Sequence, residues 1–155
     1  MDTYQDSLQK SKHYVRVCDH ILSVTYPVVN EPKVLLSALE NVFLAATKAM
    51  SALLLFERGF KRVPPFSNTF DGKYTVFQLK IIPQNKAFTQ KDAAFIGYLK
   101  ELIVFHKKSS MQFVREKQLI ICDEKYTIRR LSVELIREYL QETQLFVKKV
   151  DEAIK

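Results

Sequence analysis

Glycine is scarce in this chain, with only Gly59, Gly72 and Gly97 among its 155 residues. A loop that cradles phosphate groups needs several glycines, because its backbone amides must come close to the anion. The sequence therefore argues against a glycine-rich nucleotide-binding loop.

Cysteine and histidine are also few. Cys18 and Cys122 stand alone without a CxxC pair, which argues against a disulfide scaffold or a structural zinc site and is typical of a reducing cytosol. On a helix His13 and His20 share a face while Cys18 lies to one side, and no carboxylate completes a set of ligands. We expect no metal and no cofactor, and we expect a cytoplasmic protein.

A long uncharged apolar run is missing as well. The N-terminus, MDTYQDSLQKSKHY, is polar from the start, so we expect no signal peptide. The most apolar stretch, residues 42–56, contains Lys48 and lies between Glu40 and Glu57. A bilayer span needs about 20 apolar residues, so we interpret this stretch as a buried core helix and expect no membrane contact.

Apolar residues at helical spacing occupy most of the chain. They predict helices at about 2–25, 32–58, 70–82, 90–108 and 133–154. We expect Tyr26-Pro27 and Pro83 to end two of these helices, because the residue before a proline disfavours the α region. Gly59 is expected to cap the second helix, whose many alanines let neighbouring helices approach closely and place it at the centre.

A short segment before the last helix has a different character. The β-branched stretches QLIIC and YTIRRL flank Asp123-Glu124-Lys125 and predict a hairpin at about 117–131. The expected fold is a single all-α domain spanning residues 1–155, a four- to five-helix bundle with this small β-hairpin inserted before the C-terminal helix.

Positive charge is concentrated around the predicted hairpin. The whole chain carries +7, and residues 106–130 contribute +4 of it, from seven cations and three acids. Phe113 and Tyr126 lie among these cations, and aromatic rings beside Arg stack on unpaired bases. The candidate nucleic-acid-binding residues are Lys107, Lys108, Arg115, Lys117, Lys125, Arg129 and Arg130.

The same charges also have a purely structural interpretation. Lys107 and Lys108 lie where the C-terminus of a helix favours positive charge. Alternating Arg and Lys also protect an edge strand against aggregation. Both interpretations stay open at the level of the sequence.

The stretch SALENVFLAATKAMSALLLFER (37–58) resembles the central helix of HEPN-like four-helix bundles, over about a third of the chain. The basic segment from His106 onward is similar to that of small archaeal helical proteins. Ribonucleases of the HEPN superfamily carry an Arg, four to six residues and a His, whereas Arg16 and His20 are separated by three residues in the first helix. The resemblance therefore implies a bundle without a ribonuclease site that works by binding or pairing.

Three hypotheses for function follow. The first is a non-catalytic module that contacts RNA or a ribonucleoprotein through residues 106–130. The second is a module that binds a protein partner or a second copy through an exposed aromatic stripe bearing Phe70, Tyr74 and Phe77. The third, less favoured, is a divergent ribonuclease that uses Arg16 and His20.

Overall fold

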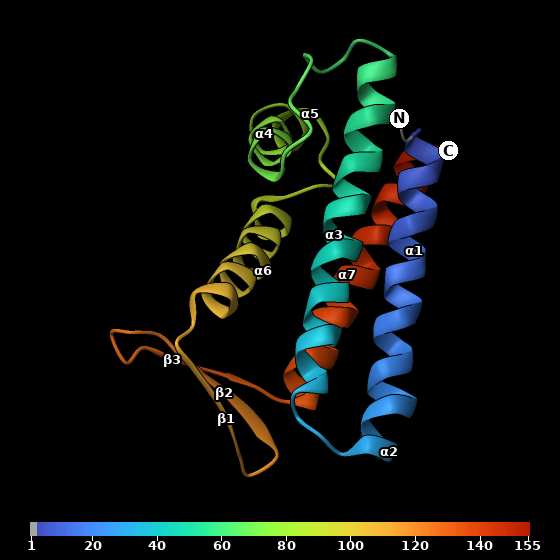
Figure 1. Ribbon diagram of the computed structural model, residues 1–155. Helices are drawn as coiled ribbons and strands as arrows, with labels where there is room; N and C mark the ends of the chain where they lie inside the picture. Colours follow the sequence, from blue (N-terminus) through green and yellow to red (C-terminus); the bar gives the residue numbers. More distant parts are fainter. Residues whose placement is uncertain (1–2) are drawn as a thin grey trace.

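A computed structural model describes residues 3–155 of the chain, and it is mainly helical, with three strands before the C-terminal helix. Three long helices, α1 (Tyr4–His20), α3 (Val34–Gly59) and α7 (Val133–Ile154), lie side by side (Figure 1). The short α4 (Phe70–Val76) and the longer α6 (Gln90–Lys108) lie across α3 from α1, and α6 also contacts α7. The predicted helical fold with strands before the last helix is confirmed, but the predicted two-stranded hairpin is a three-stranded sheet.

The first helical segment does not end before Pro27 as predicted. The chain passes from α1 through a π-helical turn, η1 (Ile21–Thr25), into the short α2 (Tyr26–Val29). The N–H of Tyr26 bonds to the carbonyl of Ile21, five residues back, and this wider turn makes room for the ring of the proline that follows. The segment ends instead at Asn30, which has a left-handed φ of 53°. The predicted start at Asp2 lies outside the described residues, and Thr3 is the N-cap of α1.

The same arrangement occurs at Pro83. A π-helical turn, η2 (Phe77–Ile81), follows α4, and α5 (Ile82–Gln84) carries Pro83 in its first turn. The N–H of Ile82 bonds to the carbonyl of Phe77. A π turn again precedes the proline, and the helix ends at Gln84, one residue after Pro83.

Helix α3 is central, as its composition predicted. Its alanines are buried, and the buried hydroxyl of Ser11 on α1 donates to the carbonyl of Ala45 at 2.6 Å. Small side chains on both helices therefore bring the two backbones close together. Helix α3 is long and apolar enough to cross a membrane. Of its most apolar 18 residues, 56% are buried inside the fold.

The end of α3 differs from the expectation. Gly59 is the last helical residue and has no positive φ, whereas Lys61 has a φ of 59°. The N–H of Lys61 bonds to the carbonyl of Arg58 at 2.9 Å, and that of Arg62 to the carbonyl of Glu57 at 3.0 Å. These two bonds form a Schellman motif with Lys61 in the left-handed position.

The predicted aromatic stripe from Phe70 to Phe77 is not an exposed surface. Phe77 is fully buried and packs edge-on against Phe88 and Phe146 at 6.0 and 5.9 Å between ring centroids. Tyr74 donates a hydrogen bond to the carbonyl of Ala93 at 2.6 Å. Phe70 and Tyr74 are partly exposed and pack against the core, so the stripe mainly joins the α4 segment to the rest of the fold.

The last two long helices begin with the predicted caps. The carboxylate of Asp92 accepts from the N–H of Thr89 at 3.0 Å, and the hydroxyl of Ser132 accepts from the N–H of Leu135 at 3.2 Å. Lys149 of α7 reaches the Asp92 carboxylate at 2.6 Å. That ion pair fixes the far end of α7 against the start of α6.

Candidate nucleic-acid interface

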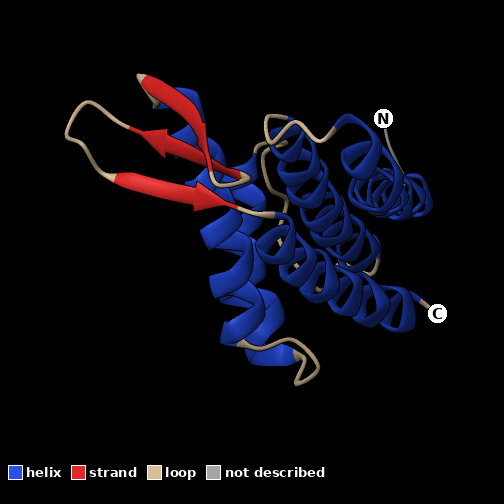
Figure 2. Cartoon of the chain, turned by 90° about the horizontal axis from the view of Figure 1, so that it is seen from below, coloured by secondary structure: helices blue, strands red, loops and turns tan. Residues whose placement is uncertain are grey.

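The sheet begins one strand earlier than predicted. Strand β1 (Met111–Arg115) pairs antiparallel with β2 (Gln118–Cys122), and β2 pairs with β3 (Ile128–Leu131). The sheet projects beyond the ends of the helices (Figure 2). The sequence analysis missed β1 because the turn that follows it has no glycine or asparagine.

The turn between β1 and β2 consists of Glu116 and Lys117, which have φ values of 51° and 63°. Two successive residues with positive φ between paired strands make a type I′ turn, whose twist matches that of the strands. Asn-Gly is the common sequence for such a turn, so Glu-Lys gave no signal. The turn places the Lys117 side chain at one end of the sheet, exposed to solvent.

The turn between β2 and β3 is organised by Asp123. Its carboxylate accepts from the N–H groups of Lys125 at 2.9 Å and Thr127 at 2.8 Å. Tyr126 has a φ of 63° and is 83% exposed, so β3 starts at Ile128 and not at the predicted Tyr126. Lys125 and Tyr126 therefore lie at the end of the sheet opposite to Lys117.

The sheet has two different faces. The strand register puts Leu119, Ile121 and Leu131 on one face, and all three belong to the hydrophobic core. We name the opposite side the outer face; it consists of Met111, Phe113, Arg115, Gln118, Ile120, Cys122, Ile128 and Arg130.

The outer face is apolar at its centre and basic at its margin. Met111, Phe113 and Ile128 are 56%, 40% and 52% exposed. Phe113 lies opposite Ile120, which in turn lies opposite Arg130. Arg115 is two residues from Phe113 on the same strand and therefore shares its face. Partly exposed apolar side chains are thus bordered by two exposed arginines, Arg115 and Arg130.

The structure separates the seven predicted binding residues into groups. Arg115 and Arg130 are on the outer face, and Lys117 and Lys125 are on the turns at its two ends. The remaining three differ in position: Lys107 and Lys108 are exposed in the last turn of α6, and Arg129 is on the core-facing side.

Arg129 is only partly exposed and packs beneath the sheet. Its guanidinium carbon lies 5.6 Å from the ring centroid of Phe105 on α6. Its Nε is buried without a hydrogen-bond partner among residues 3–155. The geometry therefore gives Arg129 a packing role, unlike its neighbour Arg130.

A second basic region was not predicted. Residues 57–80 contain five Lys or Arg and two acidic residues, a net charge of +3, and the chain outside 57–80 and 106–130 contains twelve cations and twelve acids. The cations of 57–80 come from the end of α3, the following loop and the α4 segment. The two regions together therefore account for the whole surplus of +7.

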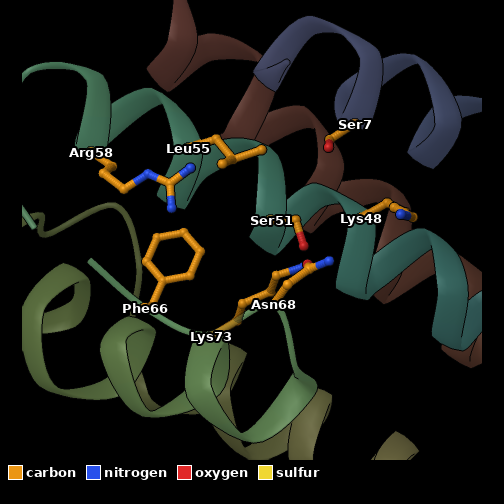
Figure 3. A pocket seen from close by; sticks show the side chains of 8 residues that line it. All are labelled: Ser7, Lys48, Ser51, Leu55, Arg58, Phe66, Asn68 and Lys73. Carbon is orange, nitrogen blue, oxygen red and sulfur yellow. The ribbon is translucent and has the colours of Figure 1, made fainter. Parts of the chain in front are cut away.

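At the second basic region a cavity of about 350 Å³ opens between α1, α3, the loop after α3 and α4 (Figure 3). We name it the α3–α4 cavity. Its lining residues are Ser7, Lys48, Ser51, Leu55, Arg58, Phe66, Asn68 and Lys73. A signal was present in the sequence, because Lys48, Ser51 and Arg58 recur at helical spacing in the mainly apolar second half of α3.

The structure brings together no catalytic set from the residues considered in the sequence analysis. Arg16 and His20 are exposed one turn apart on α1. Burial, and then the charge of Asp19, raises the pKa of Cys18 to about 12, so this thiol stays protonated at neutral pH and is a poor nucleophile. Between residues 3 and 155 no three His, Cys, Asp or Glu side chains group as metal ligands do.

Comparison with known proteins adds no family to these observations. No protein-family model, no curated protein and no solved structure matches this chain. The HEPN-like resemblance is therefore neither supported nor contradicted.

Proposed function

We propose that this protein is a non-catalytic, cytoplasmic binding module that contacts single-stranded RNA through the outer face of its sheet. The observation that carries the proposal is the exposed Phe113 on β1, which shares the outer face with the exposed Met111 and Ile128 and with Arg115 and Arg130. An aromatic ring on a sheet offers a stacking surface for an unpaired base, and neighbouring guanidinium groups neutralise phosphates.

The dimensions of the sheet suit a short stretch of RNA. A strand of five residues is about 17 Å long, and three strands are roughly 10 Å wide. Lys117 and Lys125 lie at opposite ends of β2, so each is placed to meet the backbone as it enters or leaves the outer face. Arg115 and Arg130 would hold the phosphates between these ends.

The charge of the RNA predicts how the binding depends on salt. Each phosphate neutralised on a single strand contributes about −0.7 to the slope of log K against log salt concentration. Removing two such contacts should reduce the slope by about 1.4. Loss of a stacked base should cost about 1–3 kcal/mol, which is at least a fivefold loss of affinity.

The test is fluorescence anisotropy with a labelled, mixed-sequence single-stranded RNA at several salt concentrations. The variant Arg115→Gln/Arg130→Gln should bind more weakly with a shallower slope, and Phe113→Leu should bind more weakly with an unchanged slope. The matched control Lys91→Gln/Lys148→Gln removes two exposed charges elsewhere and should keep the affinity to within a few-fold. Equal weakening by the control pair, or no binding at low salt, would contradict the proposal.

A second candidate is docking of a protein or a second copy on the same face. It is favoured by the apolar side chains of Met111 and Ile128 and by β1, which is an edge strand of the sheet. Light scattering distinguishes the two. A dimer that persists in high salt and is lost in Met111→Ser/Ile128→Ser would support this candidate.

A further inference from the structure

The α3–α4 cavity is built on a polar stripe of the central helix. Lys48, Ser51, Leu55 and Arg58 follow one another at three- and four-residue intervals, so they lie on one face of α3. Ser51 is only 4% exposed. The central helix therefore carries a hydroxyl, an ammonium and a guanidinium group into one hollow.

The opposite wall supplies more hydrogen-bond donors. Lys73 comes from α4 and Asn68 from the loop before it, and both point toward Ser51 (Figure 3). Ser7 of α1, which is 2% exposed, also lines the cavity. Phe66 lies under Arg58, with 4.7 Å between the guanidinium carbon and the ring centroid.

The lining is therefore cationic and rich in donors. Three of its eight residues are Lys or Arg, three carry a hydroxyl or an amide, and none is Asp or Glu. Lys48 and Lys73 each already take part in an interaction within the chain, so a bound anion would join those contacts. The Arg58 guanidinium lies over the Phe66 ring, and a guanidinium group carries several N–H donors that suit an oxyanion.

The surroundings of the cavity also attract anions. Lys100 lines the adjoining hollow on one side; Lys61 and Lys80 line the hollow on the other side, together with Arg62, which is paired with Glu57. One sign of charge around a cleft raises the local concentration of ligands of the opposite sign. The cavity volume lies in the range of small-molecule sites.

We propose that the α3–α4 cavity binds the phosphoryl group of a small phosphorylated compound. Arg58, Lys48 and Lys73 would neutralise the phosphoryl oxygens, Ser51 and Asn68 would donate hydrogen bonds, and Phe66 and Leu55 would contact the organic part. Because buried Ser7 and Ser51 line this hollow, it suits a compact ligand better than a continuous nucleic-acid backbone. This site is separate from the outer face and does not depend on the RNA proposal.

The experiment is calorimetric titration of the full chain with inorganic phosphate and with phenyl phosphate, using phenol as the uncharged control. Saturable binding of either phosphate, without binding of phenol, is the expected result. Equal affinities would identify free phosphate as the ligand, and tighter binding of phenyl phosphate would identify a phosphorylated organic compound. No saturation by about 10 mM, ten times a weak dissociation constant of roughly 1 mM, would overturn the proposal.

Two variants locate the binding. Arg58→Gln and Lys73→Gln should each weaken the binding of phenyl phosphate at least tenfold, whereas Lys91→Gln, at an exposed residue that lines neither the α3–α4 cavity nor the adjoining hollows, should change the affinity less than twofold. Circular dichroism and the melting temperature without ligand show whether each variant is folded.

Binding that is unchanged in both folded cavity variants would overturn the proposal. The proposal would also be overturned if the protein did not bind phenyl phosphate but bound single-stranded RNA with an affinity that Arg58→Gln lowers. The outer-face variant Arg115→Gln/Arg130→Gln should keep its full affinity for phenyl phosphate, so failure of one proposal is distinguishable from failure of the other.

Discussion

Substitution of Gly97 by alanine tests how α4 is held against α6. Gly97 lies in the middle of α6, where the ring of Tyr74 crosses it. A Cβ added at Gly97 would lie 2.6 Å from the Tyr74 hydroxyl and 3.3 Å from the ring carbon that bears it. The hydroxyl has little freedom to move, because it donates to the Ala93 carbonyl at 2.6 Å. Its pKa is raised, first by burial and then by the charge of Glu101, so it remains a donor at neutral pH.

The expected magnitude is the balance of three effects. Alanine in place of glycine inside a helix favours folding by about 1 kcal/mol. Overpacking costs about 1–3 kcal/mol, and loss of the Tyr74 hydrogen bond costs about 1 kcal/mol more. We therefore expect Gly97→Ala to lower the free energy of unfolding by about 1–3 kcal/mol.

A double-mutant cycle separates these effects. Tyr74→Phe removes the hydroxyl that the new methyl group would meet, so in that background Gly97→Ala should be neutral or stabilising. Urea unfolding of the parent, the two single variants and the double variant measures the coupling, which should be about 2 kcal/mol. A stabilising Gly97→Ala in the parent, or the same effect in both backgrounds, would refute the proposed contact.

Two further predictions concern buried groups. The pKa of the Cys18 thiol is raised to about 12 by burial, so the unfolded chain releases this proton at lower pH than the folded chain does. The thiol's contribution to the free energy of unfolding should be complete below about pH 9 and then fall by about 1.4 kcal/mol per pH unit. Urea unfolding against pH should show that fall in the parent and lose it in Cys18→Ala. Arg129 has a buried Nε without a partner among the described residues, so Arg129→Met should change the free energy of unfolding by less than about 1 kcal/mol. Arg129→Met should also leave RNA affinity unchanged, whereas Arg130→Met should lower it; equal losses would contradict the assignment of the two faces.

The sequence predicted the long helices well because they have a strong apolar period, and α6 and α7 also have local caps. Thr89 with Asp92, and Ser132 before α7, are signals within one turn of chain, and both caps are present. The helix ends near Pro27 and Pro83 were predicted less well, because the effect of a proline depends on the turn that precedes it. A π turn before Pro27 and before Pro83 shifts the carbonyl that the ring would meet, and no local residue pattern announces such a turn.

For the candidate RNA-binding site, the sequence predicted the basic segment 106–130 but not which of its side chains share one face. Neighbouring residues of a strand point to opposite faces, so Arg129 and Arg130 have different environments although they are adjacent in sequence. Without β1 and its register, the outer face of the sheet could not be identified. The α3–α4 cavity was harder still, because Ser7, Lys48 and Lys73 are far apart in the chain and meet only in the folded protein.

The most direct test of the RNA-binding proposal is an NMR titration of the isotope-labelled protein with a short single-stranded RNA. We predict that the amide signals of β1 and β3, together with the Lys117 and Lys125 turns, shift in a saturable manner. Signals of α1 and α7 should stay unchanged. Shifts confined to the lining of the α3–α4 cavity, or no shifts at low salt, would contradict the assignment of the outer face as the RNA-binding surface.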